Sequence, residues 1–268
     1  MKKMIAFDLD DTLNITKSPV DDIMADLLRR LLDGFQVCVI SGTNWELLKK
    51  FCIDPLVAIG ATAQEFANYH ILPTTGTQYW RYVSAGFPEK DLKPDQILED
   101  GWLREYANFL NDEQVKKISD SLERAAKKLD YWCANPTGEI IENRQSQVTM
   151  SALGQWATPE DKHAWDPDQK KRKAIVKLIK PELGDLGVQI NIGGGTSIDV
   201  TLPGIDKAYG MRQLMKMTGL GQDDILFIGD KLQPGGNDYP VREMGVDVIE
   251  VTGHEDTNWV LRGILAVS

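Results

Sequence analysis

The sequence predicts an α/β fold in which a parallel sheet is interrupted by an inserted α+β domain. Three observations support this prediction. Strand-like and helix-like segments alternate over residues 5–59, two strand-like runs far apart in the chain end in acidic residues, and aromatic and charged residues mix over residues 85–190. Strands joined by helical crossovers lie parallel in one sheet. We therefore expect a core domain over 1–84 and 193–268 and an inserted domain over 85–192.

The core elements follow from apolar spacing and from end signals. Apolar residues recur at helical spacing from Val20 to Leu32, behind the cap pair Ser18-Pro19, whereas shorter apolar runs are typical of buried strands. The expected core elements are a strand over 5–8, a helix over 20–32, a strand over 35–40, a short helix ending at Lys50, a strand over 55–59, a helix over 206–217, and strands over 224–230 and 246–251.

The inserted domain is expected to combine long amphipathic helices with short strands. The helices are expected over 112–129 and 167–179, and the strands over 140–142, 147–152 and 188–192. Tryptophans assigned to this domain are packing residues that could also stack on a sugar, namely Trp80, Trp102, Trp132, Trp156 and Trp165.

Composition narrows the possible partners. The 268 residues are 42% hydrophobic and carry a formal net charge of −10, which disfavours nucleic acid and anionic membranes as partners. Cys38, Cys52 and Cys133 lack metal-type spacing and indicate a reducing compartment. No signal peptide or membrane-spanning run is recognisable, so we expect a cytoplasmic protein that acts on a small phosphorylated metabolite.

The first acidic run, Asp8-Leu9-Asp10-Asp11-Thr12, closes the first strand. A carboxylate in this position can attack phosphorus and form an aspartyl-phosphate, which makes Asp8 the candidate nucleophile. Asp10 lies on the same side of an extended backbone and can serve as general acid and then base, while Thr12 can orient the pair. Taken alone, the run is equally compatible with an acidic turn after a strand.

Two further polar residues stand where strands end or helices begin. Ser41 follows the second strand and could bind phosphoryl oxygens together with backbone N–H groups. Lys207, near the start of a helix, could neutralise charge between Asp8 and a phosphate. Taken singly, a turn serine and a surface lysine are the simpler interpretations of these two residues.

The second acid-ended strand closes on Asp230. Because the carboxyl ends of parallel strands meet at one edge of a sheet, Asp230 should lie beside Asp8. Carboxylates gathered there call for a hard cation, and Mg²⁺ suits both oxygen ligands and phosphoryl chemistry. The expected metal ligands are Asp8, Asp10 and Asp230, and the residues expected to orient metal-bound water or the lysine are Asn237 and Asp238.

Together, these positions resemble the motifs of the haloacid dehalogenase superfamily. The superfamily's Asp-x-Asp-x-Thr pattern matches Asp8, Asp10 and Thr12, its second motif matches Ser41, its lysine matches Lys207, and its fourth motif matches Asp230 with Asp238. The resemblance implies a Rossmann-like core with a C2B-type cap, and phosphoryl chemistry that uses Mg²⁺.

Within the superfamily, the chain is most similar to eukaryotic-type phosphomannomutases. The run 229–238 and the segment 193–200 are close to the corresponding family segments. This similarity implies that Arg144, Ser197 and Asp199 bind substrate in the cap. It also implies that two copies could pair through their caps as a homodimer.

Three positions depart from the family pattern. Gln155 stands where the family has a second phosphate-binding arginine, Thr137 where it has another basic residue, and Asp11 where it has glycine. Glutamine cannot supply the permanent charge and bidentate contact of arginine. Losing two such residues should weaken the binding of a second phosphate by several kcal/mol, at about 1.5–3 kcal/mol per charged hydrogen bond.

The leading hypothesis is therefore a Mg²⁺-dependent phosphohydrolase of small phosphorylated sugars or related metabolites, working through an aspartyl-phosphate. The alternative is a phosphomannomutase or phosphoglucomutase that interconverts hexose 1- and 6-phosphates with a bisphosphate activator, and Gln155 favours hydrolysis over it. A third hypothesis is a non-catalytic sugar-phosphate-binding protein on the same fold, although such a protein has no need of the nucleophile Asp8.

Overall fold

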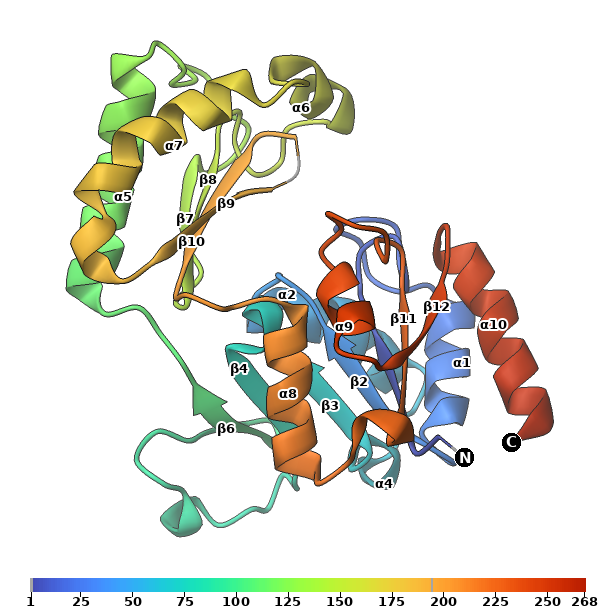
Figure 1. The fold of residues 1–268 in the computed structure, drawn as a ribbon. Helices are drawn as coiled ribbons and strands as arrows, with labels where there is room; N and C mark the ends of the chain where they lie inside the picture. The colour runs from blue at the N-terminus through green and yellow to red at the C-terminus, as the bar shows by residue number, and fades with distance from the viewer. Residues whose placement is uncertain (1, 194) are drawn as a thin grey trace. The chain divides into compact units, whose positions relative to one another are not determined.

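Residues 2–193 and 195–268 are described by the computed structural model, and they divide into two units (Figure 1). The core unit comprises Met1–Ala107 and Ile205–Ser268, and the cap unit comprises Asn108–Gly204. Gly194, within the segment 193–200 that resembles the family, lies outside the described residues. Within the described ranges, no helix is both long enough and apolar enough to cross a membrane.

A largely parallel sheet forms the centre of the core unit, with the order β12-β11-β1-β2-β3-β4-β6-β5. The parallel strands are β1 (Met4–Phe7), β2 (Gln36–Ile40), β3 (Tyr69–Leu72), β11 (Ile225–Gly229) and β12 (Asp247–Glu250). The strands β4 (Gln78–Tyr82), β5 (Ile97–Glu99) and β6 (Trp102–Ala107) continue the sheet antiparallel beyond β3. Because β1 lies between β11 and β2, the strand ending at Asp8 is flanked by the strands ending at Asp230 and Ser41.

Helices cover both faces of the core sheet (Figure 1). Ile5 and Phe7 of β1 pack with α1 (Asp22–Leu31) and α10 (His254–Val267), whereas Met4 and Ala6 pack with α8 (Lys207–Thr218) and α9 (Tyr239–Glu243). This division follows from the alternation of side chains along a strand. The remaining core helices are α2 (Trp45–Leu48), a π-helix (Lys49–Ile53), α3 (Asp54–Ala58), α4 (Ala63–Phe66) and single 3₁₀ turns at Thr74–Gly76, Glu89–Asp91 and Gln222–Asp224.

A stacked pair of indoles lies within the core unit. The rings of Trp45 in α2 and Trp80 in β4 are 3.8 Å apart between centroids, with 3° between their planes. Trp102 packs against Trp45 at 5.9 Å, and Trp45 Nε1 donates to a carboxylate oxygen of Glu99 at 3.0 Å. Trp80 and Trp102 therefore belong to the core unit, and their assignment to the inserted domain is wrong.

The cap unit is an antiparallel sheet with two long helices on one face. Its strands are β7 (Ile141–Asn143), β8 (Gln147–Ser151), β9 (Gln189–Gly193) and β10 (Ser197–Thr201), in the order β7-β8-β10-β9. Its helices are α5 (Asp112–Lys128), α6 (Pro159–Trp165), α7 (Lys170–Glu182) and a 3₁₀ turn at Gly184–Leu186. Val148, Met150, Ile198 and Val200 pack into the hydrophobic core with α5 and α7. Alternate residues of β8 and β10 make the opposite face polar.

The expected limits of the inserted domain, 85–192, differ from those of the cap unit. Residues 85–107 contain β5 and β6, which hydrogen-bond to the core sheet through β4. Residues 193–204 contain β10, which pairs with β8 inside the cap sheet. Both differences in the domain limits arise because strands pair with segments that are far away in the sequence.

Two local predictions in the core are also wrong. Residues 55–59 do not form a strand, because Asp54–Ala58 is helix α3 with Pro55 in its first turn, where its missing N–H costs no hydrogen bond. The third parallel strand is β3 instead. The first helix is capped by Asp21, whose side chain accepts from Met24 N at 2.8 Å, rather than by Ser18.

Candidate active site

The carboxylate of Asp8 stands directly after β1 and is 3% exposed. Its Oδ1 lies 2.6 Å from Nζ of Lys207 and accepts a hydrogen bond from Leu9 N at 2.7 Å. Burial raises the pKa of Asp8 to about 7, with Lys207 opposing the rise and the nearby Asp238 adding to it. The fold thus holds a carboxylate of unusual basicity against a fixed ammonium group.

Lys207 is the first residue of α8 and bridges two buried carboxylates. Its Nζ lies 2.6 Å from Asp8 Oδ1 and 2.5 Å from Asp238 Oδ1. Asp238 has no exposed surface, and its Oδ2 accepts from Lys231 N at 3.1 Å. Burial disfavours the charged form of Lys207, but the two carboxylates outweigh this effect and raise its pKa. Lys207 therefore remains an ammonium group at neutral pH.

Two glycines let the loop after β11 approach this bridge. A Cβ on Gly229 would lie 2.6 Å from Asp238 Oδ2, and a Cβ on Gly236 would lie 2.0 Å from the backbone oxygen of Lys231. Any side chain at either position would push the loop away from the lysine bridge. Gly229 and Gly236 are thus required by the close approach of backbone and carboxylate.

Three carboxylates form a group that could hold a metal. One oxygen from each of Asp8, Asp230 and Asp238 lies within 4.8 Å of the others. Asp230 Oδ2 pairs with Lys231 Nζ at 2.6 Å, while its Oδ1 is buried without a hydrogen-bond partner among the described residues. An unsatisfied carboxylate oxygen among acids fits a hard cation such as Mg²⁺. Asp238, with both oxygens engaged, is suited to position Lys207.

The loop after Asp8 contains the rest of the first motif. Asp10 is partly exposed, and its Oδ1 accepts from Lys17 N at 2.8 Å. Thr12 is fully buried, and its hydroxyl has no hydrogen-bond partner within the described part of the chain. Asp11 has φ +60°, a left-handed conformation that glycine adopts freely and aspartate tolerates. The departure from glycine at position 11 is therefore compatible with this backbone.

Ser41 lies one residue past β2, at the same edge of the sheet as Asp8. It is 3% exposed, and its hydroxyl accepts from Thr43 N at 3.1 Å. Its backbone oxygen accepts from Thr75 N at 2.8 Å, and Thr74 N donates to the oxygen of Thr43 at 2.9 Å. These bonds join the loops after β2 and β3 and fix the hydroxyl of Ser41.

Ser197 and Asp199 lie in β10 on the polar face of the cap sheet. Asp199 Oδ1 accepts hydrogen bonds from Gln147 and Thr149 of β8, both at 2.8 Å. Burial raises the pKa of Asp199, and the hydrogen bond from Thr149 and the charge of Arg144 oppose this rise. Arg144 is thus close enough to Asp199 to act on it electrostatically.

The positive charge of Arg144 is already paired within the cap unit. Its Nη2 lies 2.9 Å from Oε2 of Glu142, two residues earlier on the same side of the backbone. In the amide orientation that satisfies its neighbours, Gln155 donates to Glu142 Oε1 at 2.7 Å. The carboxylate of Glu142 therefore engages both the retained arginine and the glutamine that stands at a family arginine position.

Sequence reasoning missed Lys231 and Glu142 as partners of predicted site residues. Lys231 directly follows Asp230, and Glu142 stands two residues from Arg144, so both spacings were visible signals of pairing. Asn237 is exposed, and none of the contacts found among the described residues ties its side chain to the acid cluster. Its role in orienting metal-bound water stays a prediction.

Comparisons with known proteins agree on family and fold. A family model described as eukaryotic phosphomannomutase matches residues 86–267. Phosphomannomutase 2 of Dictyostelium discoideum is 26% identical over 241 residues, covering 88% of this chain and 84% of the relative. The phosphomannomutase of Encephalitozoon cuniculi is 25% identical over 260 residues, covering 96% of this chain and 91% of the relative.

Solved structures show the same fold at low sequence identity. The IMP-nucleotidase of Plasmodium falciparum superposes with a TM-score of 0.67 at 17% identity, covering 100% of this chain and 63% of the other. A haloacid dehalogenase-like hydrolase from Bacteroides thetaiotaomicron superposes with a TM-score of 0.60 at 14% identity, covering 98% of this chain and 100% of the other. The predicted fold class, an α/β parallel-sheet core with an inserted α+β cap domain, is confirmed.

Proposed function

Because this chain belongs to the eukaryotic phosphomannomutase family of the haloacid dehalogenase superfamily, we propose that it is a phosphomutase that transfers a phosphoryl group between two hydroxyls of a hexose. The observation that carries the proposal is the buried 2.6 Å pair between Asp8 and Lys207. This pair combines a carboxylate nucleophile with a fixed positive charge. The family relationship favours a sugar hydroxyl over water as the final acceptor.

Asp8 would act as the nucleophile. One carboxylate oxygen attacks phosphorus, the bond from phosphorus to the sugar oxygen breaks, and an aspartyl-phosphate forms. A second sugar hydroxyl then attacks this intermediate and regenerates the free carboxylate. Lys207 and the hydroxyl of Ser41 would bind the phosphoryl oxygens and stabilise their charge in both steps.

Asp10 would move the proton in each step. Its carboxylic acid protonates the departing sugar oxygen, and the resulting carboxylate takes the proton from the incoming hydroxyl. Its partial exposure and the hydrogen bond that its Oδ1 accepts from Lys17 N support this role, because the side chain is fixed yet accessible. The buried hydroxyl of Thr12 would help to orient the motif.

Asp8, the backbone carbonyl of Asp10 and Asp230 would hold Mg²⁺. When bound, Mg²⁺ would reduce the repulsion between the phosphate and the attacking carboxylate. The unpartnered Oδ1 of Asp230 supports this ligand set. Asp238 would keep Lys207 charged and in place, since it binds the ammonium at 2.5 Å.

A second candidate is a phosphohydrolase that uses the same intermediate but transfers the phosphoryl group to water. The charge of the cap unit favours this candidate. Arg144 is paired with Glu142 at 2.9 Å, while Thr137 and Gln155 occupy family positions for basic residues. A cap with less positive charge should bind the second phosphate of a hexose bisphosphate less tightly.

One assay separates the two candidates. The purified protein with Mg²⁺ receives mannose 1-phosphate or glucose 1-phosphate, each with and without the matching 1,6-bisphosphate, and both hexose 6-phosphate and free phosphate are measured. Formation of 6-phosphate that depends on bisphosphate would support the mutase, and free phosphate alone would support the hydrolase. If neither product forms, both candidates are contradicted and the non-catalytic hypothesis is favoured.

A charge-restoring variant sharpens this assay. Gln155→Arg should lower the bisphosphate concentration needed for activation by about tenfold, because one charged hydrogen bond contributes about 1.5–3 kcal/mol. Gln64→Arg, an exposed position in α4, adds the same charge in the core unit and should leave this concentration unchanged. An equal effect of both variants would argue against a phosphate site near position 155.

A further inference from the structure

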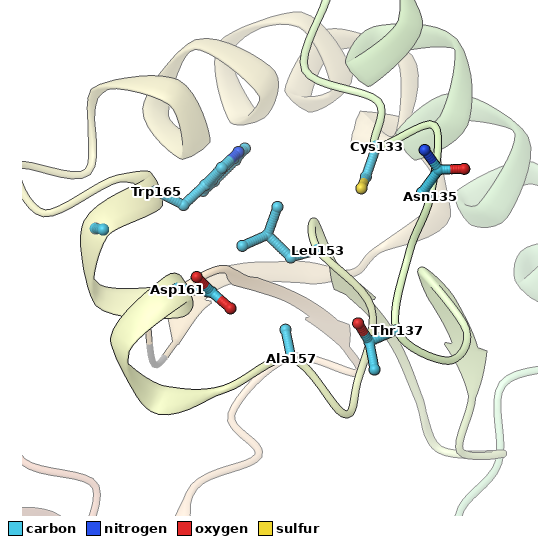
Figure 2. A pocket seen from close by; sticks show the side chains of 8 residues that line it. Cys133, Asn135, Thr137, Leu153, Ala157, Asp161 and Trp165 are labelled. Carbon is cyan, nitrogen blue, oxygen red and sulfur yellow. The ribbon is translucent and has the colours of Figure 1, made fainter.

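A cavity of about 340 Å³ lies within the cap unit and shares no lining residue with the acid cluster or with Arg144, Ser197 and Asp199. We propose that this cavity binds the ring of an uncharged sugar. Loop 133–137, the turn at Leu153 and helix α6 surround it (Figure 2). The side chains that carry the proposal are Asn135, Thr137, Leu153, Ala157, Asp161 and Trp165.

One side of the cavity is aromatic and aliphatic. Trp165 and Leu153 are half-buried and Ala157 is buried, and all three present apolar surface to the cavity. Such a surface packs against the C–H face of a sugar ring. The indole is itself held in place, since Tyr131 packs edge-on at 6.3 Å and the ammonium of Lys171 lies 4.8 Å from its ring centroid.

The polar residues of the cavity match the needs of hydroxyl groups. The side chains of Asn135 and Thr137 are exposed, and neither makes a hydrogen bond to protein among the described residues. Asp161 Oδ2 accepts from the hydroxyl of Thr158 at 2.8 Å, and the carboxylate keeps further acceptor capacity. An amide, a hydroxyl and a carboxylate together offer donors and acceptors, and each sugar hydroxyl can both donate and accept.

The charge of the lining side chains disfavours a phosphate in this cavity. Asp161 is the one charged residue among the described side chains that line it, and no lysine or arginine does so. The negative charge of Asp161 repels a phosphate. Thr137 contributes to this property, because it stands where the family has a basic residue.

Hydrogen bonds join the segments that line the cavity to one another, so the site is preformed. Thr137 N donates to the oxygen of Leu153 at 3.0 Å, and Trp156 N donates to the oxygen of Thr137 at 2.9 Å. Gly154 has φ +91°, and a Cβ there would lie 2.4 Å from the backbone oxygen of Thr137. Lys162 of α6 donates to the backbone oxygen of Gln155 at 3.0 Å. A preformed site binds with a smaller loss of conformational entropy.

The choice of a sugar over another hydroxylated ring rests on the proposed function. The existence of the cavity does not depend on that function. The site would therefore give the cap unit an affinity for an uncharged sugar ring.

The test is a binding titration of the full chain. Methyl α-mannoside and methyl α-glucoside are added separately, and the indole N–H resonance of Trp165, assigned with Trp165→Phe, is followed by NMR. We expect a saturable shift with a dissociation constant of about 1–10 mM, in line with the binding energy per atom of small neutral ligands. The Asp8→Asn protein should bind equally, so the result is independent of the phosphoryl-transfer assay.

Variants locate the binding. Thr137→Arg should fill the cavity and abolish the shift, and Asp161→Asn should weaken binding about threefold to tenfold through the loss of a charged acceptor. Lys116→Gln on the exposed surface of α5 is the matched control and should bind normally. If Thr137→Arg fails to fold, Asp161→Asn at its exposed position carries the test alone.

Three results would overturn the proposal. The first is the absence of a saturable shift with either glycoside up to about 50 mM, well above the expected range. The second is unchanged binding by both Thr137→Arg and Asp161→Asn, which would place the sugar elsewhere. The third is the same shift produced by inorganic phosphate, which would contradict an uncharged ligand.

Discussion

At the residue scale, the burial of Asp8 disfavours the charged form of its carboxyl group. Its pKa rises from 3.8 to about 7, chiefly through burial. For an acid, a folded-state pKa above the unfolded value means that the native state binds the proton more tightly. The metal-free protein should therefore lose stability as pH rises from 3.8 to 7, and a bound cation would reverse that loss.

We predict that Asp8→Asn lowers turnover by about 10³-fold or more, because an amide cannot form the acyl phosphate. Phosphate release and hexose 6-phosphate formation should be measured on protein shown to be folded by circular dichroism. Asp11→Asn is the matched control, since asparagine also tolerates the left-handed backbone at φ +60°. Full turnover by the Asp8 variant would contradict the covalent mechanism.

His70 has the opposite dependence on pH. It is 7% exposed, its Nδ1 lies 2.8 Å from the hydroxyl of Tyr79, and its Nε2 lies 3.1 Å from Oε1 of Gln36. Burial lowers the pKa of His70 from 6.5 to about 4, and the charge of Arg81 adds to this. His70 is therefore a buried residue whose two ring nitrogens both have hydrogen-bond partners.

Because its folded-state pKa is depressed, the contribution of neutral His70 is complete above pH 6.5 and is lost as pH falls towards 4. Urea unfolding at pH 7 and pH 5 should differ by up to about 2 kcal/mol through this group. His70→Asn should remove that difference, and His163→Asn, at an exposed position, should retain it. Identical pH dependence of both variants would show that His70 is not held neutral.

At the element scale, the position of α8 depends on a contact between two glycines. A Cβ on Gly76 would lie 2.3 Å from Gly210 Cα, and a Cβ on Gly210 would lie 2.4 Å from Ile40 Cδ1 and 3.0 Å from the oxygen of Thr75. Gly210 is three residues beyond Lys207, in the first turn of the same helix. The close approach of α8 to the sheet therefore sets where the lysine stands.

Gly210→Ala should destabilise the protein by about 1–3 kcal/mol through overpacking and should lower turnover by moving Lys207. Gly263→Ala in α10 is the matched substitution, because a Cβ there meets no atom within 4 Å. It should stabilise the protein by about 0.5–1 kcal/mol through helix propensity alone. Thermal unfolding and turnover of both variants test this contrast, and equal effects would contradict the packing argument.

Elements with a strong local pattern could be predicted from the sequence, and elements defined by pairing could not. α5 and β11 match the helix predicted over 112–129 and the strand predicted over 224–230, because spacing and caps are local. β4 and β6 were missed, since their mixed aromatic and charged residues alternate without a clear apolar face. The strand predicted over 55–59 was wrong, because the apolar residues after Pro55 suit a strand but the proline lies in the first turn of a helix.

The same distinction applies to the candidate site. Acids at the ends of parallel strands had to meet at one edge of the sheet, so the proximity of Asp8 and Asp230 followed from topology. The cap cavity could not be predicted, because Thr137 joins Leu153 and Trp156 through backbone hydrogen bonds that no motif encodes.

At the scale of the whole molecule, each unit has its own hydrophobic core. Met24 and Phe227 lie in cores of the core unit, whereas Ile118 and Ile198 lie in that of the cap unit. The proposed metal ligands all belong to the core unit. Metal binding should therefore stabilise segments of one unit directly.

We predict that Mg²⁺ slows amide exchange in residues 8–13 and 230–238 and that EDTA reverses this, because ion binding stabilises the loops that carry its ligands. With Mg²⁺ at 100 times its dissociation constant, the stabilisation should reach about 2.7 kcal/mol. Strands β8 and β10 of the cap unit serve as the internal control. Equal slowing in the cap strands would contradict a site confined to the core acids.

The stacked indoles of Trp45 and Trp80 have a consequence for spectroscopy. Chromophores 3.8 Å apart and nearly parallel share their electronic excitation, so the pair absorbs and emits differently from two separate tryptophans. Both residues belong to the core unit, whereas Trp132, Trp156 and Trp165 belong to the cap unit. The core unit thus contains an intrinsic optical probe whose signal changes when α2 separates from β4, without any attached label.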